Sequence, residues 1–204
     1  MKKAITTTLA LLSLVSTAFA ATPAMDLVAG QSQIGYSYDN LQTNIGALGD
    51  LGTYHANDYQ VAYGLNDKLA ITGNYLDSGS RSFYSGTTPI DNLKFDSTAI
   101  GLQYKVNKNF AVSAGSLKSE LKYDNGAASS TEAFGGIAYK QQLSNHVEGY
   151  ASYLKSSNVQ DWKAGLTYNL GSKTSLDVGY RDYQNNGTGN IVAKGLSYGI
   201  NHKF

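Results

Sequence analysis

The chain has 204 residues, a formal net charge of +1 and no cysteine. Charged residues make up 15% of it, whereas soluble domains carry about 25%. The near-neutral charge argues against nucleic acid as a partner, and the lack of cysteine excludes disulfides, thiolate metal sites and a thiol nucleophile. Such a low charge content indicates that much of the surface does not meet water.

The first twenty residues have the pattern of a secretory signal peptide. Lys2 and Lys3 precede an apolar run from about Leu9 to Val15, and Ala18-Phe19-Ala20 is a small-x-small cleavage motif. The run is about half of the roughly 20 apolar residues that a membrane helix needs. We therefore predict a cleaved signal over 1–20 and one mature domain over 21–204, whose net charge is −1 once both lysines are removed.

Apolar and polar residues alternate along nearly all of the mature chain, which predicts an all-β protein. In the clearest strand, Ile100, Leu102 and Tyr104 share one face, while Gly101 and Gln103 share the other. No mature segment offers about 18 consecutive apolar residues, so a membrane protein with this pattern has to be a closed barrel. The predicted strands lie, in chain order, near residues 30–40, 55–65, 69–78, 95–106, 110–122, 131–141, 146–155, 159–170, 174–184 and 191–204.

Short and long connections alternate between these strands. Tight turns are predicted at 66–68, 107–109, 144–145 and 171–173, and longer segments at 40–54 and 79–94. Outer-membrane barrels combine short periplasmic turns with longer outer loops and an even number of strands. The predicted fold is therefore a closed antiparallel transmembrane up-and-down β-barrel of ten strands, with eight or twelve left open. The rival is a soluble periplasmic barrel, similar to lipocalins, with its apolar faces inside.

The 16 tyrosines are typical of the aromatic girdles at the two edges of a membrane barrel. Tyr63, Tyr104, Tyr139 and Tyr168 each lie within a few residues of a predicted short turn. We expect these four rings at the periplasmic interface, although strands also favour aromatic residues in general.

The last strand carries alternating Leu196, Tyr198, Ile200 and Phe204, with His202 where an apolar residue is more usual. In this it resembles bacterial outer-membrane β-barrel proteins, whose terminal strand is recognised by the barrel assembly machinery. The final quarter, including Ser175–Arg181, also resembles YfaZ-type small barrels. These resemblances imply location in the outer membrane, contact with its lipid and lipopolysaccharide, and the barrel assembly machinery as a partner during biogenesis.

Six charged residues fall on the polar faces of the predicted strands, which would line the lumen. Asp161 and Lys163 lie on one strand and Asp177 and Arg181 on the next, so opposite charges can meet across the pair. They could form an ion-pair network that fills the interior or line a pathway for small solutes, and both alternatives stay open. The candidate lumen charges are Lys105, Lys140, Asp161, Lys163, Asp177 and Arg181.

The sequence offers little for catalysis, and we predict that the protein is not an enzyme. His55, with Asp58 three residues on, is the one histidine expected near the outer rim, where a plain rim residue is the favoured interpretation. No cofactor motif is present, so no cofactor is expected. Asp91, Asp96 and Asp124 could meet around a divalent ion, but solvated loop acids are favoured and no metal site is predicted.

Two functional hypotheses remain for an integral outer-membrane barrel. One is a narrow pore for small solutes, based on the glycine-rich polar faces. The other is a structural or surface-interaction barrel, adhesin-like and without transport, which acts through loops at 42–53 and 79–93 with Phe83 and Tyr84 as contacts. The extracellular partner is unknown.

Overall fold

The computed structural model describes residues 24–85, 88–124 and 126–204, so the predicted signal peptide lies outside the described residues. No helix in the described part is long and apolar enough to cross a membrane. The chain forms strands and one short 3-10 helix, η1 (Gly46–Leu48). The strands are β1 (Ser32–Ile45), β2 (Gly49–Gly64), β3 (Leu69–Asp77), β4 (Arg81–Ser85), β5 (Thr88–Lys105), β6 (Phe110–Tyr123), β7 (Gly126–Gln142), β8 (Val147–Ser156), β9 (Val159–Asn169), β10 (Thr174–Asn185) and β11 (Ile191–Lys203).

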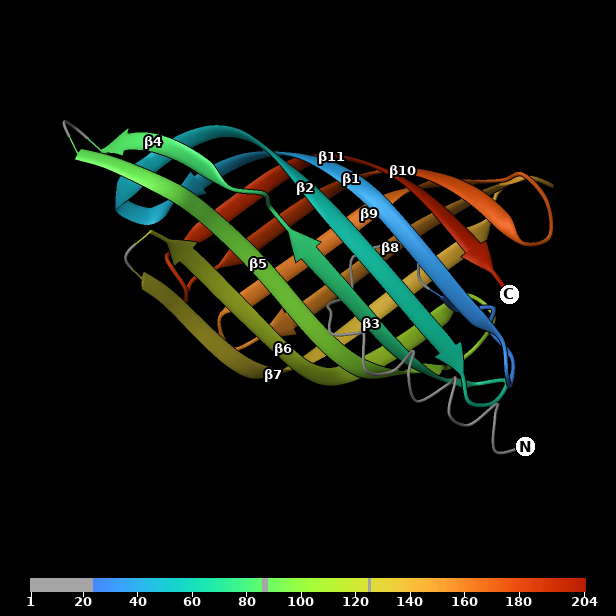
Figure 1. Ribbon diagram of the computed structural model, residues 1–204. Helices are drawn as coiled ribbons and strands as arrows, with labels where there is room; N and C mark the ends of the chain where they lie inside the picture. The colour runs from blue at the N-terminus through green and yellow to red at the C-terminus, as the bar shows by residue number, and fades with distance from the viewer. Residues whose placement is uncertain (1–23, 86–87, 125) are drawn as a thin grey trace, which may run out of the picture.

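Antiparallel pairing closes these strands into a barrel. The sheet runs from β3 through β2 and β1 to β11 and back along the chain to β5, and pairing of β3 with β5 completes the ring of ten strands. The additional strand β4 pairs with the start of β5 and extends that edge beyond the ring. Figure 1 shows the tilted strands, with the β4–β5 hairpin at one end and the C-terminus at the other. The predicted ten-stranded barrel is confirmed.

Four tight turns join strands at the end where β1 begins and β11 finishes, as predicted. Two use the same local chemistry: the Asn66 side chain accepts hydrogen bonds from the backbone N–H groups of Lys68 and Leu69, and Asn107 does the same for Asn109 and Phe110. Short turns beside the C-terminus identify this end as periplasmic and the opposite end as extracellular.

The extracellular end differs from the prediction of long loops. Residues 42–53 continue β1 and β2 into a hairpin closed by η1, and residues 81–85 pair with 88–93 in the β4–β5 hairpin. Gly49, with φ of +75°, follows η1 in a backbone conformation that favours glycine. β2, β5 and β7 therefore reach 16, 18 and 17 residues, well beyond the 9 to 11 that a membrane crossing needs.

The polarity of the barrel wall reverses along the strands. In the periplasmic half of β5, Ile100, Leu102 and Tyr104 face outward and are 45–49% exposed. In its extracellular half the apolar Leu93 and Phe95 are buried inside. Other strands repeat this reversal, with Tyr36 and Tyr38 outward on β1 but Leu41 and Ile45 inward.

This reversal fixes where the membrane lies. The outward apolar belt occupies the periplasmic half of the wall and includes the four predicted girdle tyrosines, which are 37–51% exposed. A soluble lipocalin-like barrel would bury that belt, so the rival fold is wrong. Above the belt the wall has an apolar inside and a polar outside, the pattern of a barrel in water. The extracellular half therefore projects beyond the bilayer.

Candidate functional site

A completely buried arginine, Arg181 on β10, organises the middle of the bore. Its Nε and Nη2 atoms donate to the two carboxylate oxygens of Asp161 at 3.0 and 2.6 Å, which is a bidentate pair. Nη1 donates to Asp39 at 2.9 Å and to Asp58 at 3.0 Å. Because the acids come from β1, β2 and β9, one guanidinium connects walls that are far apart in the sequence.

A second polar group lies beside this cluster, closer to the periplasm. The Tyr150 hydroxyl donates to Asp177 at 2.6 Å, and the Lys163 ammonium lies 4.0 Å from the same carboxylate. Lys163 also donates to the Ser37 hydroxyl at 3.4 Å. The four aspartates of the two groups outnumber the two cations, so this level of the bore carries an excess of carboxylates.

Glycines make room for Tyr150 in the bore. A Cβ atom at Gly179 would lie 2.6 Å from the Tyr150 hydroxyl, and one at Gly165 would lie 2.9 Å from it. Both distances are shorter than any stable contact between these atoms. The two inward glycines thus provide the space that the tyrosine fills, rather than leaving a channel.

Aromatic rings fill the bore on the extracellular side of Arg181. The Tyr183 ring stacks on Phe95 with centroids 6.1 Å apart, and Phe95 packs against Tyr54 at 5.9 Å. A guanidinium caps each end of this series: Arg181 lies 5.9 Å from the Tyr183 centroid and Arg81 lies 5.0 Å from that of Tyr54. These rings belong to a buried apolar cluster contributed by most of the wall.

The charged level and the aromatic level together close the bore. Arg181, Lys163, Tyr54, Phe95 and Tyr183 are each at most 2% exposed. Side chains at two consecutive levels therefore exclude solvent, as expected for a barrel whose strand number is close to that of barrels filled by their own side chains.

The segment that precedes β1 folds into the periplasmic mouth. Met25 and Leu27 are buried, and the Asp26 carboxylate forms ion pairs with Lys140 of β7 and with Lys203 of β11, the latter at 3.4 Å. Burial alone would raise the pKa of Asp26, but the two ammonium groups hold it below its ordinary value. Lys140 also pairs with Glu148 at 2.8 Å.

A cavity of about 380 Å³ lies beside this segment at the periplasmic mouth. Its lining is polar and includes Gln33, Thr167, Asn169, Asn201 and the ion-paired Lys140. The cavity forms a vestibule below the closed levels of the bore.

The six predicted lumen charges separate into two groups in the structure. Asp161, Lys163, Asp177 and Arg181 come together in the middle of the bore. Lys140 lies at the periplasmic mouth instead, and Lys105 is half-buried at the periplasmic end of β5.

Asp39 and Asp58 are not among the predicted lumen charges, although both bind Arg181. One signal was available: Asp39 follows Gly35 and Ser37 on the face of β1 opposite Tyr36 and Tyr38, so alternation alone places it inside. Asp58 was considered only as a neighbour of His55. A separation of three residues on a strand puts two side chains on opposite faces.

The histidines take part in ordinary polar and aromatic contacts. His55 faces outward, where its Nδ1 lies 2.5 Å from the Asn40 side-chain oxygen and its ring stacks on Tyr38 at 5.5 Å. It therefore cannot act with the inward Asp58. Among the described residues no group of three or more His, Asp or Glu side chains is arranged to hold a metal ion.

The remaining predicted residues lie on the outer face of β11, at the C-terminus and in the extracellular hairpin. Leu196, Tyr198 and Ile200 face outward on β11, and Phe204 follows it with 60% exposure. Phe83 and Tyr84 pair through their backbones with Ile90 and Pro89 in the β4–β5 hairpin, and their side chains lie outside the described part.

Comparison with solved structures finds outer-membrane barrels. The translocator domain of the autotransporter NalP from Neisseria meningitidis aligns with a TM-score of 0.51 and 11% identity, over 85% of this chain and 88% of that one. The attachment invasion locus protein Ail of Yersinia pestis aligns at 0.44 and 15%, over 87% and 100%. An outer-membrane channel from Pseudomonas putida F1 aligns at 0.45 and 10%, over 91% and 99%.

These similarities concern the fold. No protein-family model and no curated protein sequence matches the chain, so the resemblance of its last quarter to YfaZ-type barrels has no support from a family match. The closed ten-stranded ring and its outward apolar belt are those of an integral outer-membrane protein.

Proposed function

We propose that this outer-membrane barrel acts through its extracellular end and does not conduct solutes through an open bore. The observation that carries the proposal is the filling of the bore at two levels, by the ion pairs of Arg181 and by the rings of Tyr54, Phe95 and Tyr183. A solute that entered the periplasmic vestibule would meet these buried side chains.

The shape of the extracellular half supports a role in surface interaction. A minimal membrane crossing would end near the top of the apolar belt, yet β1, β2 and β5 to β7 continue above it and form a projection. This projection has its own apolar core, so it does not depend on a partner to bury apolar surface. The β4–β5 hairpin extends beyond the ring at the extracellular end and is therefore the candidate for contact (Figure 1).

Conductance is the first test of this proposal. Refolded mature protein in planar lipid bilayers should give no stable single-channel steps. Its barrel state should be verified by a mobility shift on boiling in a denaturing gel. Reproducible conductance steps from protein that shows the mobility shift would refute the closed bore and favour the hypothesis of a narrow pore.

Deletion of the projecting hairpin tests the surface role. Outer-membrane vesicles that carry the barrel should bind cultured epithelial cells more than vesicles without it. Removal of residues 80–89 should abolish that excess while preserving the heat-dependent mobility shift. If vesicles with the folded deletion variant bind cells as well as those with the intact barrel, another part of the barrel makes the contact. If the intact barrel gives no excess binding, its role is structural.

We also infer that the barrel assembly machinery reads the final strand. The outward set of Leu196, Tyr198 and Ile200 followed by Phe204 supports this inference, because an apolar alternation on an exposed strand is available for recognition before the barrel closes.

A further inference from the structure

A row of ion pairs lies on the outer surface of the wall, directly above the lipid-facing belt. On β5 the outward side chains change from Tyr104, Leu102 and Ile100 to Asp96 and Lys94 as the strand rises. The neighbouring strands bring Asp77 of β3 and Lys118, Glu120 and Lys122 of β6 to the same region. The boundary between apolar and charged surface therefore runs through this patch, which we call the rim network.

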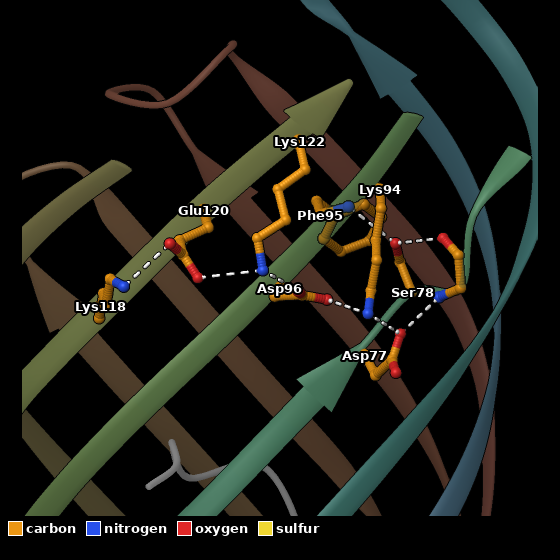
Figure 2. A network of polar contacts seen from close by, with 9 residues as sticks. Asp77, Ser78, Lys94, Phe95, Asp96, Lys118, Glu120 and Lys122 are labelled. Atoms are coloured by element: carbon orange, nitrogen blue, oxygen red, sulfur yellow. Dashed lines mark hydrogen bonds and ion pairs between the residues drawn. The ribbon is translucent and has the colours of Figure 1, made fainter. Parts of the chain in front are cut away.

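The rim network is continuous across the three strands (Figure 2). Lys94 lies 3.0 Å from Asp77 and 3.3 Å from Asp96, and Lys122 lies 3.0 Å from the other oxygen of Asp96. Glu120 continues the row, with Lys122 at 3.3 Å and Lys118 at 2.9 Å. Each carboxylate holds an ammonium group in a fixed position on the wall.

On β5 and β6 the network is layered, with the carboxylates of Asp96 and Glu120 beneath the ammonium groups of Lys118 and Lys122. The side chains of Lys118 and Lys122 are 45% and 44% exposed, against 3% for Asp96 and 25% for Glu120. At its β3 edge, Asp77 and Lys94 are exposed to similar extents, 27% and 22%. Although three lysines balance three acids in number, the groups presented to the surroundings are mainly cationic. An ammonium has three N–H donors, so Lys118 and Lys122 can bind a further anion while they keep their carboxylate partners.

Stability alone does not account for this arrangement. Exposed ion pairs contribute about 0 to 1 kcal/mol each. Lys94 and Lys122 stand directly opposite each other across β5 and β6, and like charges in that position destabilise a strand pair. Asp96 lies between the two ammonium groups and offsets part of that repulsion, and an external anion at the surface would offset more of it.

We propose that the rim network binds the phosphate groups of lipid A in the outer leaflet. Lipid A carries its phosphates where its acyl chains end, which is the level at which the outward surface of β5 changes from apolar to charged. The acyl chains would cover Ile100 and Leu102 while the phosphates meet Lys118 and Lys122. This site is independent of the proposed function, because it involves the outer wall and not the bore.

Native mass spectrometry of the folded mature protein in detergent micelles tests the site with three added lipids. These are lipid A with two phosphates, monophosphoryl lipid A and phosphatidylglycerol. Wild-type protein should bind the diphosphorylated lipid most tightly. Equal binding of phosphatidylglycerol would overturn the proposal, since the surface would then attract any anionic lipid. This comparison needs no variant, so it holds even if a substitution impairs folding.

A pair of variants locates the binding. Replacing Lys118 and Lys122 together by Gln should weaken binding of diphosphorylated lipid A by about 25-fold, from about fivefold per lysine near an anionic surface. The matched control replaces Lys68 and Lys108, two exposed lysines in the turns at the periplasmic end of the barrel, by Gln. The control should change binding less than about twofold, because these lysines lie at the opposite end of the barrel and salt screens charges that are more than about 10 Å apart. Equal losses in the two variants, or no loss in the first, would refute the site.

Discussion

Replacement of Arg181 by Met is the most direct test of the ion-pair cluster in the bore. Met approximates the length of the arginine stem but removes its charge and its N–H donors. Asp39, Asp58 and Asp161 would then remain buried without their shared cation. Removing one partner of a buried ion pair costs about 3 to 5 kcal/mol. Because three carboxylates lose their partner here, we expect a value near the upper end, about 5 kcal/mol.

Urea unfolding of the barrel in lipid vesicles measures this free energy. Tryptophan fluorescence reports the transition, since Trp162 lies on the outer face of β9 and leaves the lipid on unfolding. Arg181→Lys is the control: it keeps one charge, loses the bidentate geometry with Asp161 and should fall between the other two proteins. A loss below about 1 kcal/mol for Arg181→Met would show that the carboxylates are satisfied without the guanidinium, and the reasoning would fail.

Three further predictions concern other parts of the molecule. Gly179→Ala should destabilise the barrel by about 1 to 3 kcal/mol in the same urea assay, because its Cβ would overlap the Tyr150 hydroxyl, whereas Gly171→Ala in an open turn should be neutral. Asp26→Asn should lower stability by at most about 1 kcal/mol at pH 7, and the difference from wild type should vanish as the pH falls through the lowered pKa of Asp26, since the carboxylate then protonates in both states. Deletion of Phe204 should reduce assembled barrel in membrane fractions, measured by heat-dependent mobility, without preventing refolding of the purified chain in detergent.

Each of these has an outcome that would contradict it. Equal effects of the two glycine substitutions would deny the close approach in the bore. A difference between Asp26→Asn and wild type that persists once Asp26 is protonated would mean that the carboxylate charge is not what stabilises the mouth. Normal assembly without the terminal phenylalanine would remove it from the recognition signal.

The periplasmic half of the fold was predictable because alternation, turn chemistry and membrane-crossing length agree there. Asn66 and Asn107 occupy turns whose geometry their side chains enforce, so strand ends were located closely. The apolar alternation of Ile100, Leu102 and Tyr104 could face only lipid once the barrel was closed.

The extracellular half was mispredicted because its alternation changes phase. Leu41 and Ile45 face inward, and Asn40 and Asn44 face outward. The outer face therefore lacks apolar residues here, and the pattern indicates the end of a strand although the strand continues. The glycines of 46–52 strengthened the impression of a loop, although they serve a tight connection.

The bore was predicted in part. Asp161 and Arg181 lie on adjacent strands, so their meeting follows from local pairing. Asp39 and Asp58 reach Arg181 from β1 and β2, across β11, and that proximity depends on the register with which the first and last strands pair to close the barrel. Sequence alternation gives the face of a residue but not its height relative to a distant strand.

The point at which apolar residues switch from the outer to the inner face of the wall marks the level of the membrane surface on the barrel. Lowering the barrel in the bilayer by about four residues would place charged Asp96 in hydrocarbon, and raising it by the same amount would expose apolar Ile100 to water. The outward side chains thus determine the depth of the barrel in the bilayer, independently of how its ends are anchored. A bilayer thinner than the belt would have to stretch to meet this level, so the barrel should sort toward membranes of matching thickness and resist tilting in them.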